Sequence, residues 1–232
     1  MLVEEQNKTR VGPHNFLWID QHPDQKSRAW FSQDVLEPLK TLDHGNEIAV
    51  PDGLIQDWVG AVFLENATLE RVRDVILGFA NYKTVFKQQI ADSRLVKRDG
   101  DHYDAFLRIY RRQVEAVVLN ANISSDYTLV DPNRGYVICR STHIGEALHN
   151  KKSASEEERS PQDEYGYLWR MNLYWRLEYA DNGIYAELEL ISLSHQPGGR
   201  ISRLLNGFVE DFPRGFVAGF MDGLRLAFPN TR

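Results

Sequence analysis

The feature that most constrains this chain is a pair of alternating runs around a tight-turn signal. The runs are YLWRMNLYWRLEYA and IYAELELISLS, and Asp181-Asn182-Gly183 lies between them. Alternation of apolar and polar residues is typical of strands with one buried face. Asn-Gly favours a type I′ turn, because both central positions need positive φ. With Asn182 and Gly183 there, the sequence predicts the cross-strand pairs Tyr179–Ala186, Leu177–Leu188, Trp175–Leu190 and Arg176–Glu189.

A second constraint is an apolar stripe at the C-terminal end, between Ile201 and Phe228. Its residues recur every four positions: Leu204, Phe208, Phe212, Phe216, Phe220 and Leu224. This spacing predicts one long helix, with a kink or a restart at Pro213. The helix is the expected cover for the apolar face of the hairpin.

Five more strand-like runs precede the hairpin. They are LIQDWVGAVFL after the turn signal at Pro51, QIADSRLVK, HYDAFLRIYRR, EAVVLNANI and GYVICRSTHI. Helical spacing over residues 69–79, after a start signal at Thr68, and a short segment over 83–87 interrupt them. The order predicts an α+β domain with a seven-stranded antiparallel sheet.

The remaining segments are more polar. Residues 1–29 predict an extended arm, and Ala29–Leu42 predicts a helix packed on the main domain. Residues 145–164 are charged and serine-rich, which predicts a mobile loop. We therefore expect an N-terminal extension, residues 1–51, and a main domain, residues 52–232.

Composition excludes several classes of protein. Hydrophobic residues make up 42% of the 232, enough for a sizeable core. The net charge of −6 is spread without a basic face, so we expect no nucleic-acid partner. The opening MLVEEQNKTR resembles neither a signal peptide nor a membrane span. We expect a soluble chain, cytoplasmic by default or extracytoplasmic if a leader was removed; its oligomeric state stays open.

The element order, the WRMNLYWRLEY hairpin strand and the LSHQPGGRISRLLNGFVEDFPRGF approach to the last helix resemble the helix-grip superfamily. This superfamily includes START lipid-transfer domains, polyketide cyclases and pollen-allergen-like proteins, and the chain is most similar to uncharacterised bacterial START-like proteins. The resemblance covers about residues 52–228. It implies a curved sheet wrapped around the C-terminal helix, with a cavity for lipids, sterols or polyketides. The motifs are diffuse, so they support the fold better than the function.

Polar residues alternate along the predicted strands and form the first candidate site. The members that could orient the polar end of a ligand are Arg108, Tyr110, Asn172, Tyr174, Arg176 and Glu189. The alternative is a solvated outer sheet face with weak cross-strand ion pairs. Which face they occupy decides between the two interpretations.

Apolar residues form the second candidate site, as plain core or as the wall of a cavity. They are Trp169, Met171 and Trp175 on the hairpin, with Phe216 and Phe220 on the helix. Gly215, Gly219 and Gly223 recur every four residues of that helix, although each glycine costs a helix roughly 0.5–1 kcal/mol. Close packing against the sheet, room for a ligand or a helix that shifts would each compensate.

No motif for catalysis or cofactor binding stands out. The histidines lack metal-ligand spacing, no phosphate-binding glycine loop is present, and Cys139 lies in an apolar run that predicts burial. We expect no metal, no cofactor and no assigned catalytic residue.

Three hypotheses about function remain. The first is binding or transport of a small hydrophobic ligand, lipid-like or aromatic. The second is a polyketide cyclase or dehydratase using Arg108, Tyr110, Tyr174 and Arg176. The third is an interaction protein with a filled core, whose N-terminal helix around Trp30 docks a partner.

Overall fold

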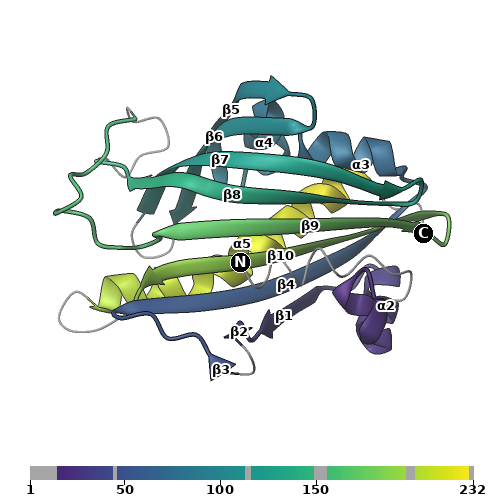
Figure 1. The fold of residues 1–232 in the computed structure, drawn as a ribbon, viewed down its shortest axis with the longest axis horizontal. Helices are drawn as coiled ribbons and strands as arrows, with labels where there is room; N and C mark the ends of the chain where they lie inside the picture. The colour runs from purple at the N-terminus through teal and green to yellow at the C-terminus, as the bar shows by residue number, and fades with distance from the viewer. Residues whose placement is uncertain (1–14, 44–45, 113–115, 149–155, 197–201, 230–232) are drawn as a thin grey trace.

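The chain is described by a computed structural model that covers residues 15–43, 46–112, 116–148, 156–196 and 202–229 (Figure 1). The helices are η1 (Trp18–Gln21), α2 (Pro23–Trp30), α3 (Leu69–Ile76), η2 (Phe79–Asn81), α4 (Tyr82–Val85) and α5 (Ser202–Ala227). The strands are β1 (Val35–Leu39), β2 (Leu42–Asp43), β3 (Asn46–Glu47), β4 (Gly53–Glu65), β5 (Ile90–Asp99), β6 (His102–Arg112), β7 (Ala116–Asp131), β8 (Arg134–Glu146), β9 (Arg170–Ala180) and β10 (Gly183–His195).

One curved antiparallel sheet organises the molecule, in the order β1-β4-β10-β9-β8-β7-β6-β5. The seven predicted strands are all present, and α3 begins where expected, with the Thr68 side chain accepting a hydrogen bond from the Arg71 amide. The sheet has eight strands instead of seven because β1 is added at one edge.

Strand β1 overturns the predicted helix over Ala29–Leu42. The helix of this region, α2, lies earlier and begins with Pro23 at its first position, where the missing N–H costs nothing. Val35 is buried against the N-terminal segment, whereas Leu36 lies beside Gly60, on the side of α5. Because Val35 and Leu36 both pack against the protein, on opposite faces, the strand has no clean period of two, and its adjacent apolar residues have the spacing of a helix.

The hairpin forms where predicted, but in a different register. Asp181 and Asn182 are the two residues with positive φ, at 54° and 61°. Arg176 therefore pairs with Glu187, not with Glu189, and Trp175 pairs with Leu188. Gly183 starts β10 instead of completing the turn. A Cβ there would lie 2.5 Å from the Leu64 carbonyl oxygen, so the glycine is needed for close strand approach.

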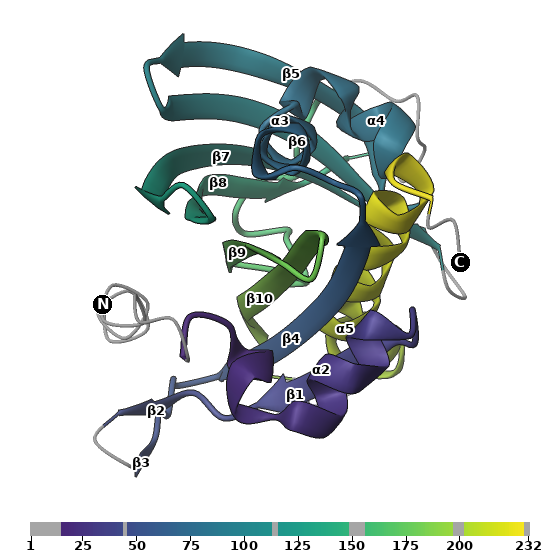
Figure 2. The same ribbon diagram turned by 90° about the vertical axis from the view of Figure 1, so that its right-hand side faces the viewer.

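Helix α5 runs without interruption from Ser202 to Ala227, so the predicted restart at Pro213 does not occur. It lies along one side of the curved sheet, while α2 lies next to β1 (Figure 2). A Cβ on Gly60 of β4 would be 3.3 Å from Met221 of α5, which shows how closely helix and sheet approach. We call the sheet face toward α5 the concave face and the opposite one the convex face.

The convex face is partly covered by the N-terminal segment. Phe16, Leu17, Ile19 and Ala29 form a second small core with Phe63 and Tyr185 of the sheet. Residues predicted as an extended arm therefore include the helix η1 and most of α2, which pack on β4 and β10.

The described part of the predicted mobile loop is held against the sheet. Glu156 accepts two hydrogen bonds from Arg94, at 2.6 and 3.0 Å, and Glu158 lies 2.7 Å from the His143 ring. Residues 149–155 of that loop lie outside the described residues.

Candidate functional site

The interior between the concave face and α5 is aromatic. Phe208, Phe212, Phe216 and Phe220 form a column along α5 with successive ring centroids 4.9–5.1 Å apart. Phe220 also contacts the Trp175 ring at 5.7 Å. Met171, Trp175, Phe216 and Phe220 are all fully buried, so these four predicted residues are brought together.

Polar side chains also lie within this largely apolar interior. The Tyr82 hydroxyl donates to the Ile76 carbonyl, and burial raises the pKa of Tyr82 well above its ordinary value. Burial also raises the pKa of the Cys139 thiol to about 12. Both groups therefore stay protonated at neutral pH, and Cys139 is a buried, unreactive residue, as its sequence context predicts.

A further polar group is the indole N–H of Trp175. The residue is 1% exposed, and its Nε1 has no hydrogen-bond partner among the described residues. Leaving a buried donor unsatisfied costs about 1–3 kcal/mol. The concave face thus carries this unsatisfied donor, and the Ser125 and Ser192 hydroxyls on the same face are also buried without a described hydrogen-bond partner.

The predicted polar residues lie on the other face of the sheet. Because neighbours along a strand point to opposite faces, Asn172, Tyr174 and Arg176 project away from Met171 and Trp175. Arg176 donates to the Phe16 carbonyl at 3.1 Å, beneath the N-terminal segment. The convex face carries all six predicted polar residues: Arg108, Tyr110, Asn172, Tyr174, Arg176 and Glu189. They cannot line one cavity with Trp175.

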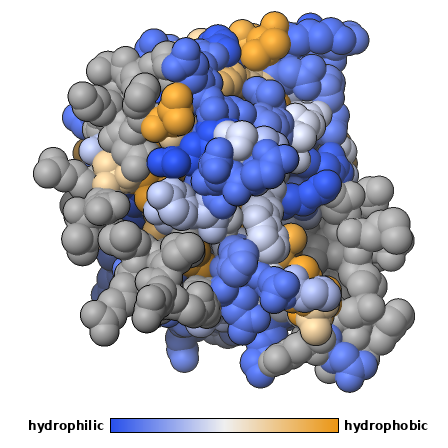
Figure 3. Space-filling view, turned by 90° about the vertical axis from the view of Figure 1, so that its left-hand side faces the viewer, coloured by the Kyte–Doolittle hydropathy of each residue, from blue (hydrophilic) through white to orange (hydrophobic). Residues whose placement is uncertain are grey.

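Trp169 lies at the rim, just before β9. It is 37% exposed, and its ring meets His195 edge-on at 5.6 Å. Figure 3 views the molecule from this end, where β9 starts, and the surface there is mainly hydrophilic, with hydrophobic residues in separate small groups.

The glycines of α5 face side chains that sequence reasoning missed. A Cβ on Gly215 would overlap the Arg111 guanidinium, one on Gly219 the Gln89 amide and one on Gly223 the Phe86 ring. The four-residue glycine spacing was the available signal, but it could not identify these partners. The close-packing interpretation holds, with the α4–β5 segment and the end of β6 as the packing surface.

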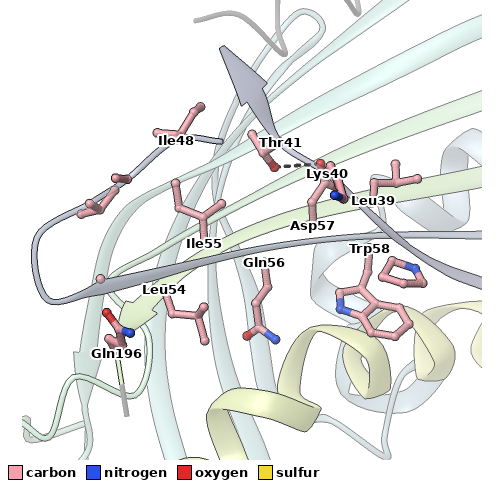
Figure 4. Close-up of a pocket in the computed structure, with 14 residues that line it drawn as sticks. Leu39, Lys40, Thr41, Ile48, Leu54, Ile55, Gln56, Asp57, Trp58 and Gln196 are labelled. Atoms are coloured by element: carbon pink, nitrogen blue, oxygen red, sulfur yellow. Dashed lines mark hydrogen bonds between the residues drawn. The ribbon is translucent and has the colours of Figure 1, made fainter. Parts of the chain in front are cut away.

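Two of the clefts at the surface lie beside β4 and beside α5. One, of about 530 Å³, lies at the edge of β4 beyond the end of β1, where Thr41 donates to Asp57 at 3.0 Å (Figure 4). The other, of about 370 Å³, lies between α4 and α5 and is lined by Phe86, Gly219, Gly223 and their neighbours.

The described ranges show neither a metal-ligand cluster nor a membrane-spanning helix. They contain no group of three or more His, Cys, Asp or Glu side chains placed to hold a metal. In the same part of the chain, no helix combines the length and apolar character needed to cross a bilayer.

Comparisons with known proteins concern the fold. No protein-family model and no curated protein sequence matches the chain. The human StarD13 (DLC2) lipid transfer and protein localization domain is similar in structure, with a TM-score of 0.50 and 10% identity over 92% of this chain and 98% of that one. The di-domain ARO/CYC BexL from the BE-7585A biosynthetic pathway gives a TM-score of 0.51 and 13% identity, over 95% of this chain and 63% of that one. A STAR-related lipid transfer protein fragment from Xanthomonas axonopodis gives 0.48 and 15%, over 82% and 98%.

Sheet, helix and topology together therefore give an α+β helix-grip fold that is START-like and polyketide cyclase-like.

Proposed function

We propose that this chain binds or carries a small hydrophobic molecule, lipid-like or aromatic, between the concave face of its sheet and α5. The observation that carries the proposal is the indole N–H of Trp175, a buried donor without a described partner in a largely apolar interior. A ligand carbonyl or hydroxyl would accept from it. Burial of the ligand's apolar body would contribute about 25 cal/mol per Å².

The START-like fold supports the proposal at the level of architecture alone, since one fold serves many functions. Within this proposal, residues 52–232 are the ligand-binding unit. Residues 1–51 are an extension that adds β1 to the sheet and covers part of its convex face.

A cyclase-type enzyme is not favoured by a specific observation. Its candidates Arg108, Tyr110, Tyr174 and Arg176 lie on the convex face, away from Trp175. Tyr82 is on the concave side, but its raised pKa and its bond to the Ile76 carbonyl make it a poor proton donor to a substrate.

Native mass spectrometry of the purified chain, followed by extraction, tests the proposal. We expect a copurifying lipid-like or aromatic mass, and a Trp175→Phe variant with lower occupancy. Loss of one hydrogen bond of about 1 kcal/mol corresponds to roughly fivefold weaker binding. If the protein is apo, a fluorescence titration with 1-pyrenebutanol follows. Absence of binding there as well would overturn the proposal.

A further inference from the structure

Two polar side chains project onto the glycine face of α5. Gln89 follows α4 and Arg111 lies near the end of β6. Their terminal groups lie against Gly219 and Gly215 so closely that any side chain at these helix positions would overlap them. The two contacts are one helical turn apart, about 6 Å along the axis.

The Gln89 side chain is buried without an evident structural reason. It is 3% exposed, and neither its amide nitrogen nor its amide oxygen has a hydrogen-bond partner in the part of the chain that the structure describes. Its backbone is fixed, since Gln89 N–H donates to the Phe86 carbonyl and the Gln89 carbonyl accepts from Tyr110 N–H, at 3.0 and 2.7 Å. The backbone of Gln89 is therefore held by its hydrogen bonds to Phe86 and Tyr110, and the side-chain amide lies against Gly219.

Two features that lower stability occur together at Gln89 and Gly219. A buried amide without partners lowers the stability of the fold, and a glycine in a helix is less favourable than an alanine. A leucine at 89 would remove the first cost, yet the chain has a hydrogen-bonding group there and a glycine that makes room for it. Residues that lower local stability without improving the packing of the fold are typical of binding sites.

Arg111 adds positive charge beside this amide. Its Nη2 donates to the Asp211 carbonyl at the long distance of 3.5 Å. Desolvation lowers the pKa of Arg111 more than the nearby charge of Asp211 raises it. Burial therefore disfavours the charged form of the guanidinium, and the charge of Asp211 offsets this effect only in part.

A largely apolar cleft lies next to the Gln89 end of this pair. Gly219 also lines the cleft of about 370 Å³ between α4 and α5, together with Val85, Phe86, Gly223 and Leu226. Lys87 is the charged residue of its lining. A ligand body in the cleft would bring its polar end to the Gln89 amide.

We propose that Gln89 and Arg111 bind the carboxylate of an amphipathic ligand whose apolar body extends into the space beside α4 and α5. The proposal rests on the ligand-binding function above and specifies the ligand class, with the ligand body in the α4–α5 cleft, whose lining does not include Trp175. A carboxylate has two acceptor oxygens, so it accepts from the amide and the guanidinium together, and charge-assisted bonds are the stronger kind.

The test compares two fluorescent probes with the same body, 1-pyrenebutanoate and its neutral analogue 1-pyrenebutanol. The wild-type protein should bind the carboxylate at least about tenfold more tightly, the equivalent of one charge-assisted hydrogen bond. Gln89→Leu and Arg111→Met should each reduce this preference several-fold and leave the affinity for the alcohol unchanged. Gln33→Leu and Arg170→Met, at exposed positions, are matched controls and should keep the preference.

Thermal unfolding separates binding from structure. Gln89→Leu should unfold at the wild-type temperature or higher, because it removes an unsatisfied amide, whereas a lower temperature would show a structural role and overturn the proposal. Equal binding of both probes to the wild type would refute the carboxylate site and leave the carrier function standing. If neither probe binds, both the carboxylate site and the carrier function are contradicted.

Discussion

At the residue scale, Glu178 is a carboxylate in an unfavourable setting. It is 9% exposed on the convex face of β9, under the N-terminal segment. Burial, then the charge of Asp20, raises its pKa to about 7, against the opposing effects of Lys26 and Arg134. The folded protein therefore binds a proton here at pH values where the unfolded chain has already lost it.

This predicts a pH-dependent stability that a single substitution removes. Because the folded pKa lies above the unfolded one, Glu178 makes stability fall as pH rises from about 4.5 to about 7, by at most about 3 kcal/mol. Glu178→Gln should gain stability relative to wild type across this window, measured by urea unfolding at several pH values. Glu70→Gln, at an exposed side chain, is the control; a parallel pH profile for wild type and Glu178→Gln would contradict the prediction.

Gly183 offers a second residue-scale test. Gly183→Ala should lower the free energy of unfolding by about 2–4 kcal/mol, because its Cβ would press on the Leu64 carbonyl and the Phe63 ring. Gly100→Ala has open space and only a positive φ, so about 1 kcal/mol is expected. Equal losses in chemical denaturation would mean that close strand approach is not the reason for the glycine.

These residues also show which features of the hairpin could not be predicted from the sequence. Asn-Gly is the stronger turn signal, but Asp181 takes positive φ as readily as Asn182, and the contact of Gly183 with β4 is invisible in a local pattern. The two-residue change of register kept each side chain on its predicted face. Faces were therefore predicted correctly even where cross-strand partners were not.

At the element scale, α5 depends on its aromatic contacts, and Phe220 is their centre. Its ring lies 4.4–5.8 Å from those of Phe86, Tyr82, Phe216 and Trp175. Phe220→Ala should cost about 3–5 kcal/mol of unfolding free energy.

Leu226→Ala, at a side chain of α5 that is 71% exposed, should stay within about 0.5 kcal/mol of wild type. Calorimetry or urea unfolding decides the comparison. Losses of similar size in the two variants would show that the aromatic column does not anchor the helix.

Elements with a regular apolar period were predictable and β1 was not. Helix α5 and strands β9 and β10 repeat their apolar residues with the period of their type. Strand β1 is short, and its adjacent residues Val35 and Leu36 pack on opposite faces against groups distant in sequence.

At the scale of the whole molecule, the order of elements and its resemblance to the helix-grip superfamily predicted the architecture. The candidate site was predicted only in part. Periodicity tells which residues share a face, so Trp175 and Arg176 were separated correctly and α5 covers the apolar face as expected, but periodicity does not tell which other segments contact α5. Gln89 and Arg111 come from chain segments whose meeting with α5 depends on the complete fold.

The position of β4 in the sheet has a consequence for how the chain reaches this fold. Gly53 pairs with His195, so the earliest long strand has the last strand as its neighbour, while β5 to β9 pair in sequence order. On a ribosome, β4 would emerge well before β10 exists, and the meander could form in the interval. Joining strands so distant in sequence closes a long loop, which slows folding. The sheet is therefore expected to be completed late, at β4 and β10, with α5 docking only afterwards.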